Sequence, residues 1–136
     1  MQNTELAKDY VIRSEKRLSA LKALFKVEAW ADVVRESQEV VELALKGLLR
    51  FCNVEVPRIH DVSEILIKEE SQIPKSIKPE ISKLAKISKS LRRDRELAFY
   101  GSEDLTPKDF YSKEDAKLAM DQAHFVVATV KPEVLK

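Results

Sequence analysis

The sequence has 136 residues, of which 44% are hydrophobic and 35% are charged, and a net charge of +1. This is the composition of a globular protein, and the length fits one domain spanning residues 1–136. The lone Cys52 excludes a disulfide framework and fits a reducing compartment. No segment has the apolar core of a signal peptide or a membrane span. We therefore expect a cytoplasmic protein with no membrane contact.

Glycine is scarce, which bears on the fold class. Gly47 and Gly101 are the two glycines of the whole sequence. Tight β-hairpin turns depend on glycine, so the composition favours an all-α fold.

Apolar residues recur every three or four positions from Thr4 to Phe25, and again from Glu28 to about Asn53. This period predicts two long amphipathic helices. The second pattern is the clearer one, and we expect its helix to supply much of the core. Its predicted inner face is a single stripe of Trp30, Val33, Val34, Ser37, Val41, Ala44, Leu45, Leu48 and Cys52.

Two further helices are expected in the middle of the chain. Asp61 and Glu64 have the spacing of a capping box, which predicts a short third helix with Asp61 as its N-cap. A fourth helix is expected after Pro79 and should continue to about Tyr100, where Gly101 would terminate it.

A last helix is predicted near the end of the sequence, because Ser112 and Asp115 repeat the capping-box spacing. Single amphipathic helices are not stable alone and must bury their apolar faces against one another. We therefore predict an up-and-down antiparallel bundle of about five helices. The inner face of the last helix is expected to contain Ala116, Ala119, Met120, Ala123, Val126, Val127 and Val130.

The fourth helical segment concentrates positive charge. Residues 75–95 contain eight basic and two acidic side chains, a local net charge of +6. This pattern is consistent with a surface that follows a phosphate backbone or with an ordinary solvated face. No aromatic residue lies between the lysines for base stacking. At about 100° per residue, one sector of the helix would contain Lys75, Lys78, Lys86, Lys89 and Arg93.

The stretch RRDRELAFYG, residues 92–101, is a candidate site for an anion or a partner protein. If the helix keeps its phase, Arg95 points toward the apolar side and Arg92 lies at its edge. A buried guanidinium then needs a carboxylate, a partner surface or an anion. The alternative is that the helix loosens before Arg95, which would remove this argument.

No group of residues has the spacing of a metal site. His60 and His124 are the only histidines, and they are far apart in sequence. No phosphate-cradling glycine loop and no recognisable nucleophile motif are present, so we expect neither metal nor cofactor. Glu42 and Lys46 form a favourable i,i+4 pair, with Gln38 one further step back on the same line.

These segments together resemble the HEPN domain family, the higher eukaryotes and prokaryotes nucleotide-binding domain, over most of the chain. WADVVRESQEVVELALKGLL is similar to the family's second helix, with its line of Gln38, Glu42 and Lys46. VPRIHDVSEIL is similar to the next segment and places His60 before the third helix. RRDRELAFYG is similar to the end of the fourth helix in one branch of the family.

The resemblance implies a homodimer that works beside a minimal nucleotidyltransferase as a toxin-antitoxin pair. Many members are metal-independent ribonucleases, whose motif is an arginine followed after four to six residues by a histidine. The motif would place its histidine between Ala98 and Tyr100 if counted from Arg93, or between Tyr100 and Ser102 if counted from Arg95. None of these residues is a histidine. The tyrosine pKa of about 10 makes Tyr100 a poor general base near neutrality.

The preferred interpretation is a binding module, partner of a nucleotidyltransferase, that holds a nucleotide, RNA or another anionic ligand. The alternative is a metal-independent ribonuclease with a non-standard active site, so enzymatic activity stays open and any enzyme would be an endoribonuclease. The candidate ligand-binding residues are Arg92, Arg93, Arg95, Tyr100, Gln38, Glu42, Lys46 and His60.

Overall fold

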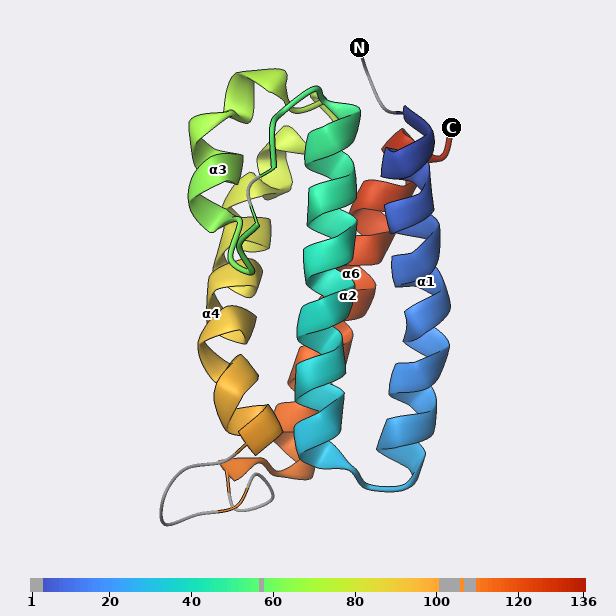
Figure 1. Ribbon diagram of the computed structural model, residues 1–136, viewed down its shortest axis with the longest axis vertical. Helices are drawn as coiled ribbons and strands as arrows, with labels where there is room; N and C mark the ends of the chain where they lie inside the picture. The colour runs from blue at the N-terminus through green and yellow to red at the C-terminus, as the bar shows by residue number, and fades with distance from the viewer. Residues whose placement is uncertain (1–3, 57, 101–105, 107–109) are drawn as a thin grey trace.

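The computed structural model describes residues 4–56, 58–100, 106 and 110–136, with the side chains of residues 93–100 outside the description. These residues form five α-helices and no strand. The four long helices alternate in direction and pack as an antiparallel bundle (Figure 1). The predicted all-α up-and-down bundle is therefore confirmed. The helices are α1 (Thr4–Lys26), α2 (Trp30–Phe51), α3 (Ser63–Lys68), α4 (Ile81–Tyr100) and α6 (Lys113–Val134).

The central helix is α2, which contacts α1, α4 and α6. Because it has neighbours on several sides, its buried surface is wider than the predicted stripe and includes Val40 and Leu49. Trp30 and Cys52 are only partly buried. The Trp30 ring lies 4.9 Å from that of Phe25, edge to face, at the corner between α1 and α2. α2 is the core helix, as predicted, but Trp30 lies at the margin of that core.

Both ends of α2 are set by left-handed backbone. Glu28 has a φ of 62°, so the helix begins at Trp30 rather than at Glu28 as predicted. Asn53 has a φ of 63°, and the N–H of Val54 donates to the carbonyl of Leu49 at 2.9 Å. α2 therefore ends at Phe51, two residues before the predicted end.

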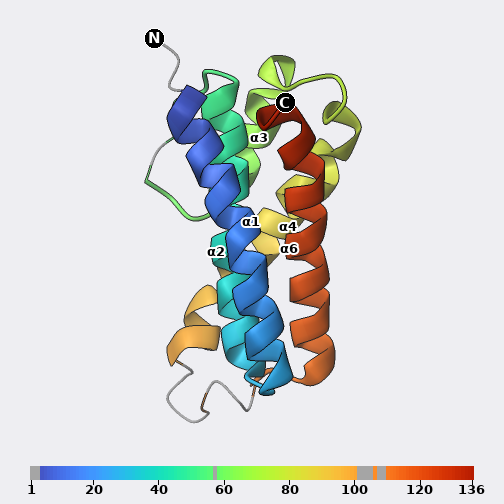
Figure 2. The same ribbon diagram turned by 90° about the vertical axis from the view of Figure 1, so that its right-hand side faces the viewer.

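α1 and α2 approach each other closely at Gly47. A Cβ atom at this position would lie 2.8 Å from Cγ2 of Val11 and 3.1 Å from the carbonyl oxygen of Ala7. These distances are shorter than van der Waals contact, so the packing requires a residue without a side chain. Figure 2 shows α1 crossing directly in front of α2.

The predicted capping box of the third helix is wrong. α3 begins at Ser63 with Val62 as its N-cap and no side-chain cap. Oδ1 of Asp61 instead accepts from the N–H of Ser63 at 2.9 Å and from Oγ of Ser88 at 3.1 Å. Because Ser88 belongs to α4, Asp61 attaches the segment before α3 to the neighbouring helix.

The predicted capping box of α6 is confirmed. Oγ of Ser112 accepts from the N–H of Asp115 at 3.3 Å, and Oδ2 of Asp115 accepts from the N–H of Ser112 at 2.9 Å. The predicted inner face is buried except for the partly exposed Met120. α6 ends at Val134, one turn beyond Val130, the last residue of the predicted inner face.

α4 follows the prediction in length but not in the extent of its basic stripe. A turn and a 3₁₀ helix over Lys78–Glu80 precede it, so Lys75 and Lys78 do not share its helical phase. The predicted five-residue stripe is therefore wrong, whereas Lys86 and Lys89 are both exposed on α4.

The backbone of α4 is helical to Tyr100, so the alternative that the helix loosens before Arg95 is wrong. The side chains of Arg93, Arg95 and Tyr100, and the predicted terminator Gly101, lie outside the described residues. Within the described part of the chain, no helix has the length and apolar character to cross a membrane.

Candidate functional site

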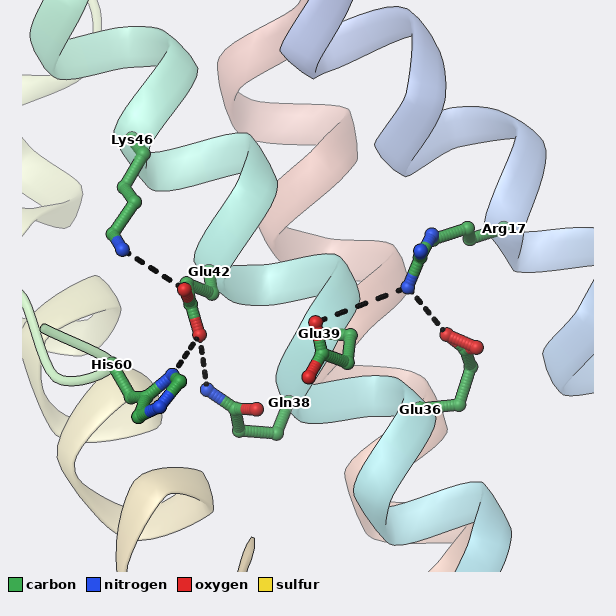
Figure 3. A network of polar contacts seen from close by, with 7 residues as sticks. All are labelled: Arg17, Glu36, Gln38, Glu39, Glu42, Lys46 and His60. Carbon is green, nitrogen blue, oxygen red and sulfur yellow. Dashed lines mark hydrogen bonds and ion pairs between the residues drawn. The ribbon is translucent and has the colours of Figure 1, made fainter. Parts of the chain in front are cut away.

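Four of the predicted site residues meet at one carboxylate (Figure 3). Nε2 of Gln38 donates to Oε1 of Glu42 at 2.9 Å, and Nζ of Lys46 donates to Oε2 at 2.9 Å. Nδ1 of His60 lies 2.8 Å from Oε1 of the same carboxylate. We call these residues the Glu42 cluster. The one-turn spacing on α2 aligns three of them, and the segment before α3 brings the fourth.

The Glu42 cluster favours the ionised form of its carboxylate. Burial is the largest influence on the pKa of Glu42 and raises it, because a charged group loses its hydration. Hydrogen bonds from Lys46, His60 and Gln38, together with the charge of Lys46, outweigh burial and lower the pKa below its usual 4.5. Glu42 is therefore a carboxylate at neutral pH.

The ionised carboxylate fixes the orientation of His60. A carboxylate only accepts hydrogen bonds, so Nδ1 of His60 carries the hydrogen and donates to Glu42. In the neutral ring this places the free lone pair on Nε2. The His60 side chain is 40% exposed, whereas that of Glu42 is 15% exposed. The cluster thus holds one imidazole in a defined tautomer at the protein surface.

A second polar contact joins α2 to α1 on the opposite side of the helix (Figure 3). Nη1 of Arg17 lies 2.9 Å from Oε1 of Glu36 and 3.9 Å from Oε2 of Glu39. Burial, the largest influence, raises the pKa of Glu36, and the opposing charge of Arg17 does not fully offset it. Two partly buried carboxylates on one helix therefore have pKa values shifted in opposite directions.

A basic pocket of about 530 Å³ lies where α4 faces the segment before α3. It is lined by Lys86, Lys89 and Arg92, together with Ser90 and Asp61. Three cations face one carboxylate, and Oδ1 of that carboxylate already accepts from Ser63 and Ser88. The basic pocket therefore has a net positive charge, and the guanidinium group of Arg92 offers paired hydrogen-bond donors. This arrangement suits phosphate.

Sequence reasoning identified some of these lining residues and missed others. Arg92 was a predicted ligand residue, and Lys86 and Lys89 belonged to the predicted stripe. Asp61 was predicted as a helix cap, and Ser90 was not singled out. Helical phase alone could have placed Ser90 near the lysines. Asp61 could not be placed there in this way, because it comes from the segment before α3.

An aromatic ring also lies beside the lysines of α4. Nζ of Lys83 is 3.7 Å from the centre of the Phe125 ring, which belongs to α6. The basic segment itself contains no aromatic residue, as the sequence shows. The bundle nevertheless places an aromatic ring of α6 beside it. Among the described residues, no group of three or more His, Cys, Asp or Glu side chains could hold a metal ion.

The fold and these sites define an antiparallel helical-bundle domain with a basic surface next to a carboxylate-held histidine. The family profile described as HEPN domain matches residues 7–133, and the chain belongs to this family. It is 31% identical over 135 residues to a protein of Methanocaldococcus jannaschii named "Putative toxin MJ1304", covering 95% of this chain and 88% of the relative.

The fold is also similar to a solved structure. The crystal structure of ST0689, an archaeal HEPN homologue, superposes with a TM-score of 0.69 and 23% sequence identity. The match covers 98% of this chain and 99% of the other. At this identity the likeness supports the fold, and the family assignment comes from the sequence matches.

Proposed function

We propose that residues 1–136 act as one HEPN binding module that holds a phosphate-bearing ligand, a nucleotide or RNA, at the basic pocket. The observation that carries this proposal is the convergence of Lys86, Lys89 and Arg92 on one hollow of about 530 Å³. Pockets for small ligands span about 300 to 1,000 Å³, so a nucleotide fits this size.

The chemistry of the lining favours a phosphate over an uncharged ligand. Arg92 offers paired N–H donors that match two phosphate oxygens, and the two lysines add charge from the flank. Arg93, Arg95 and Tyr100 stay predicted ligand residues, because their side chains lie outside the described residues. Gln38, Glu42 and Lys46 would act indirectly, by holding His60 at the border of the site.

We further propose that the module is a homodimer in the cytoplasm and the partner of a minimal nucleotidyltransferase in a toxin-antitoxin pair. The supporting observation is the 31% identity to the relative named "Putative toxin MJ1304". Co-expression with the protein encoded beside it, followed by size-exclusion chromatography with light scattering, tests both assemblies. A monomer that binds no nucleotidyltransferase would contradict this part of the proposal.

Ligand binding is tested by titrating a labelled single-stranded RNA and AMP at several salt concentrations. The double variant Lys89→Ala/Arg92→Ala should bind the RNA at least about 10-fold more weakly and show a shallower salt dependence. The control Lys22→Ala/Lys26→Ala removes the same charge from exposed positions on α1. Equal weakening in both variants would show attraction by net charge alone and would contradict a pocket.

A second candidate function is a metal-independent endoribonuclease with a non-standard active site. The observation that favours it is the 2.8 Å contact that orients His60, because a carboxylate-held imidazole is a suitable general base. Incubating the protein with RNA in the presence of EDTA tests it. Cleavage that is lost in a folded His60→Gln variant would establish the ribonuclease, whereas intact RNA supports the binding module.

A further inference from the structure

A second hollow of about 480 Å³ lies between α4 and α6, next to the basic pocket. Its apolar wall consists of Ile87, Leu118 and Phe125, and Ser90 and Gln122 add groups that can donate and accept hydrogen bonds. Leu118 is 60% exposed, so this apolar residue is open to a ligand. We call this hollow the α4–α6 groove.

The α4–α6 groove and the basic pocket adjoin each other. Lys86 and Ser90 line both of them. A ligand that places a phosphate beside Lys89 and Arg92 can therefore extend an attached group over Ser90 into the groove. In Figure 1, α4 lies to one side of α2 and α6 runs behind α2.

The lining of the groove matches the chemistry of a nucleobase. A base has a flat apolar face and a polar edge, and the groove offers an aromatic ring beside amide and hydroxyl groups. The Phe125 ring already carries a cation, because Nζ of Lys83 lies 3.7 Å from its centre. Lys83 is exposed on a flexible stem, so a base can replace it on the ring while the ammonium moves to a phosphate.

A helix of a partner protein fits the groove less well. Such a helix needs a strip of apolar anchors, and Leu118 is the one exposed large hydrophobic side chain that lines the groove among the residues described. Asp121 on the rim is paired with Lys117 at 3.3 Å, so the rim keeps the net positive charge of Lys83 and Lys86. This charge favours an anionic ligand.

We propose that the α4–α6 groove is a base-binding subsite for the nucleotide unit whose phosphate occupies the basic pocket. This inference rests on the proposed phosphate-binding function and adds a contact to the base. The shared chemistry is a nucleobase joined to a phosphate, whether it belongs to a free nucleotide or to a single-stranded RNA.

The experiment compares ligands that differ only in the base. One pair is an oligouridylate and an abasic oligonucleotide of the same length and charge, and the other is AMP and ribose 5-phosphate. The base-bearing member of at least one pair should bind about 5- to 100-fold more tightly, the range expected for one stacked base. The oligonucleotide pair and the mononucleotide pair distinguish the two sources of the ligand.

Variants locate the effect in the groove. Leu118→Ser and Phe125→Leu should remove most of the preference for the base, whereas Phe125→Tyr should keep it because the ring remains. Ile67→Ser is the matched control, since Ile67 is 57% exposed but belongs to α3. If Phe125→Leu does not fold, the exposed Leu118 still decides the outcome.

Two results would overturn the inference. Equal binding of base-bearing and abasic ligands would contradict the base-binding subsite and leave the proposed phosphate pocket intact. This result is expected if the groove binds a protein segment instead of a base. A base preference that Leu118→Ser and Phe125→Leu leave unchanged would place the base elsewhere. Failure of all four ligands to bind would instead contradict the proposed function itself.

Discussion

The two sides of α2 are built differently. Against α1 the helix packs so closely that a Cβ atom at Gly47 would lie 2.8 Å from Val11. Toward α4, apolar residues such as Leu84 and Leu91 still pack in the core, but the Glu42 cluster and two hollows border this side. The α1 side is closed by direct helix packing, whereas the α4 side leads to two hollows lined by lysines.

The same contrast appears in the carboxylates. Glu36, on the α1 side, pairs with Arg17, and its pKa is raised because burial, together with the negative charge of Glu39, outweighs the neighbouring arginines. Glu42 accepts from three residues, and its pKa is lowered although burial acts in the opposite direction. Hydrogen-bond donors and neighbouring charges therefore set the direction in which the pKa of each partly buried carboxylate shifts.

The largest expected effect comes from filling the α1 side. Gly47→Val should lower the free energy of unfolding by about 3 kcal/mol, because its side chain has no space beside Val11 and Ala7. Urea denaturation measures this loss. Adding Val11→Ala to Gly47→Ala should restore part of the stability that Gly47→Ala loses. Purely additive losses would show that the close approach is not the cause.

On the α4 side, Glu42→Ala should cost about 2 to 3 kcal/mol, because Lys46 and the buried Gln38 lose their acceptor. Glu36→Ala is the matched change on the α1 side and should cost about 1 kcal/mol or less, since the Arg17 side chain is 38% exposed. Denaturation of the two variants under the same conditions tests the comparison. Equal costs would remove the distinction between the two carboxylates.

Acid should act on the two carboxylates in opposite directions. A lowered folded-state pKa means that Glu42 contributes stability above about 4.5, the ordinary value, and loses it as the pH falls through the folded pKa. The raised pKa of Glu36 means that its protonation favours the folded state as the pH falls. Between pH 6 and 3, Glu42→Gln should flatten the loss of stability and Glu36→Gln should steepen it, as measured by thermal melting.

The smallest effect on stability is expected from the basic pocket. Lys86→Ala and Lys89→Ala should each change the free energy of unfolding by less than about 0.5 kcal/mol, because both side chains are exposed. The same variants should weaken RNA binding. A large loss of stability in either one would show that the lysines hold the fold rather than a ligand.

Much of the bundle is predictable from the sequence, because helical periodicity and local capping depend on neighbouring residues. The Ser112 capping box and the burial of the α6 inner face follow from such local signals. The cap of α3 did not follow, because Ser88 of α4 binds Asp61 through a contact between distant segments. The left-handed residues Glu28 and Asn53 likewise moved helix ends that periodicity alone could not place.

The candidate site, like the fold, is only partly predictable from the sequence. The line of Gln38, Glu42 and Lys46 follows from i,i+4 spacing, so its alignment on α2 was predictable. The arrival of His60 at Glu42 was not derivable from spacing, since a loop of several residues intervenes. The position of Phe125 beside the basic segment could not be predicted from that segment, because α6, a separate helix of the bundle, supplies the ring.

The position of Trp30 gives the protein a built-in optical reporter. It is the sole tryptophan of the sequence, and its ring rests on Phe25 at the α1–α2 corner. Its emission therefore reports on the α1 side of the bundle, while circular dichroism averages over every helix. In a Glu42→Ala variant, a dichroism transition that precedes the change in tryptophan emission would reveal that the α4 side melts first.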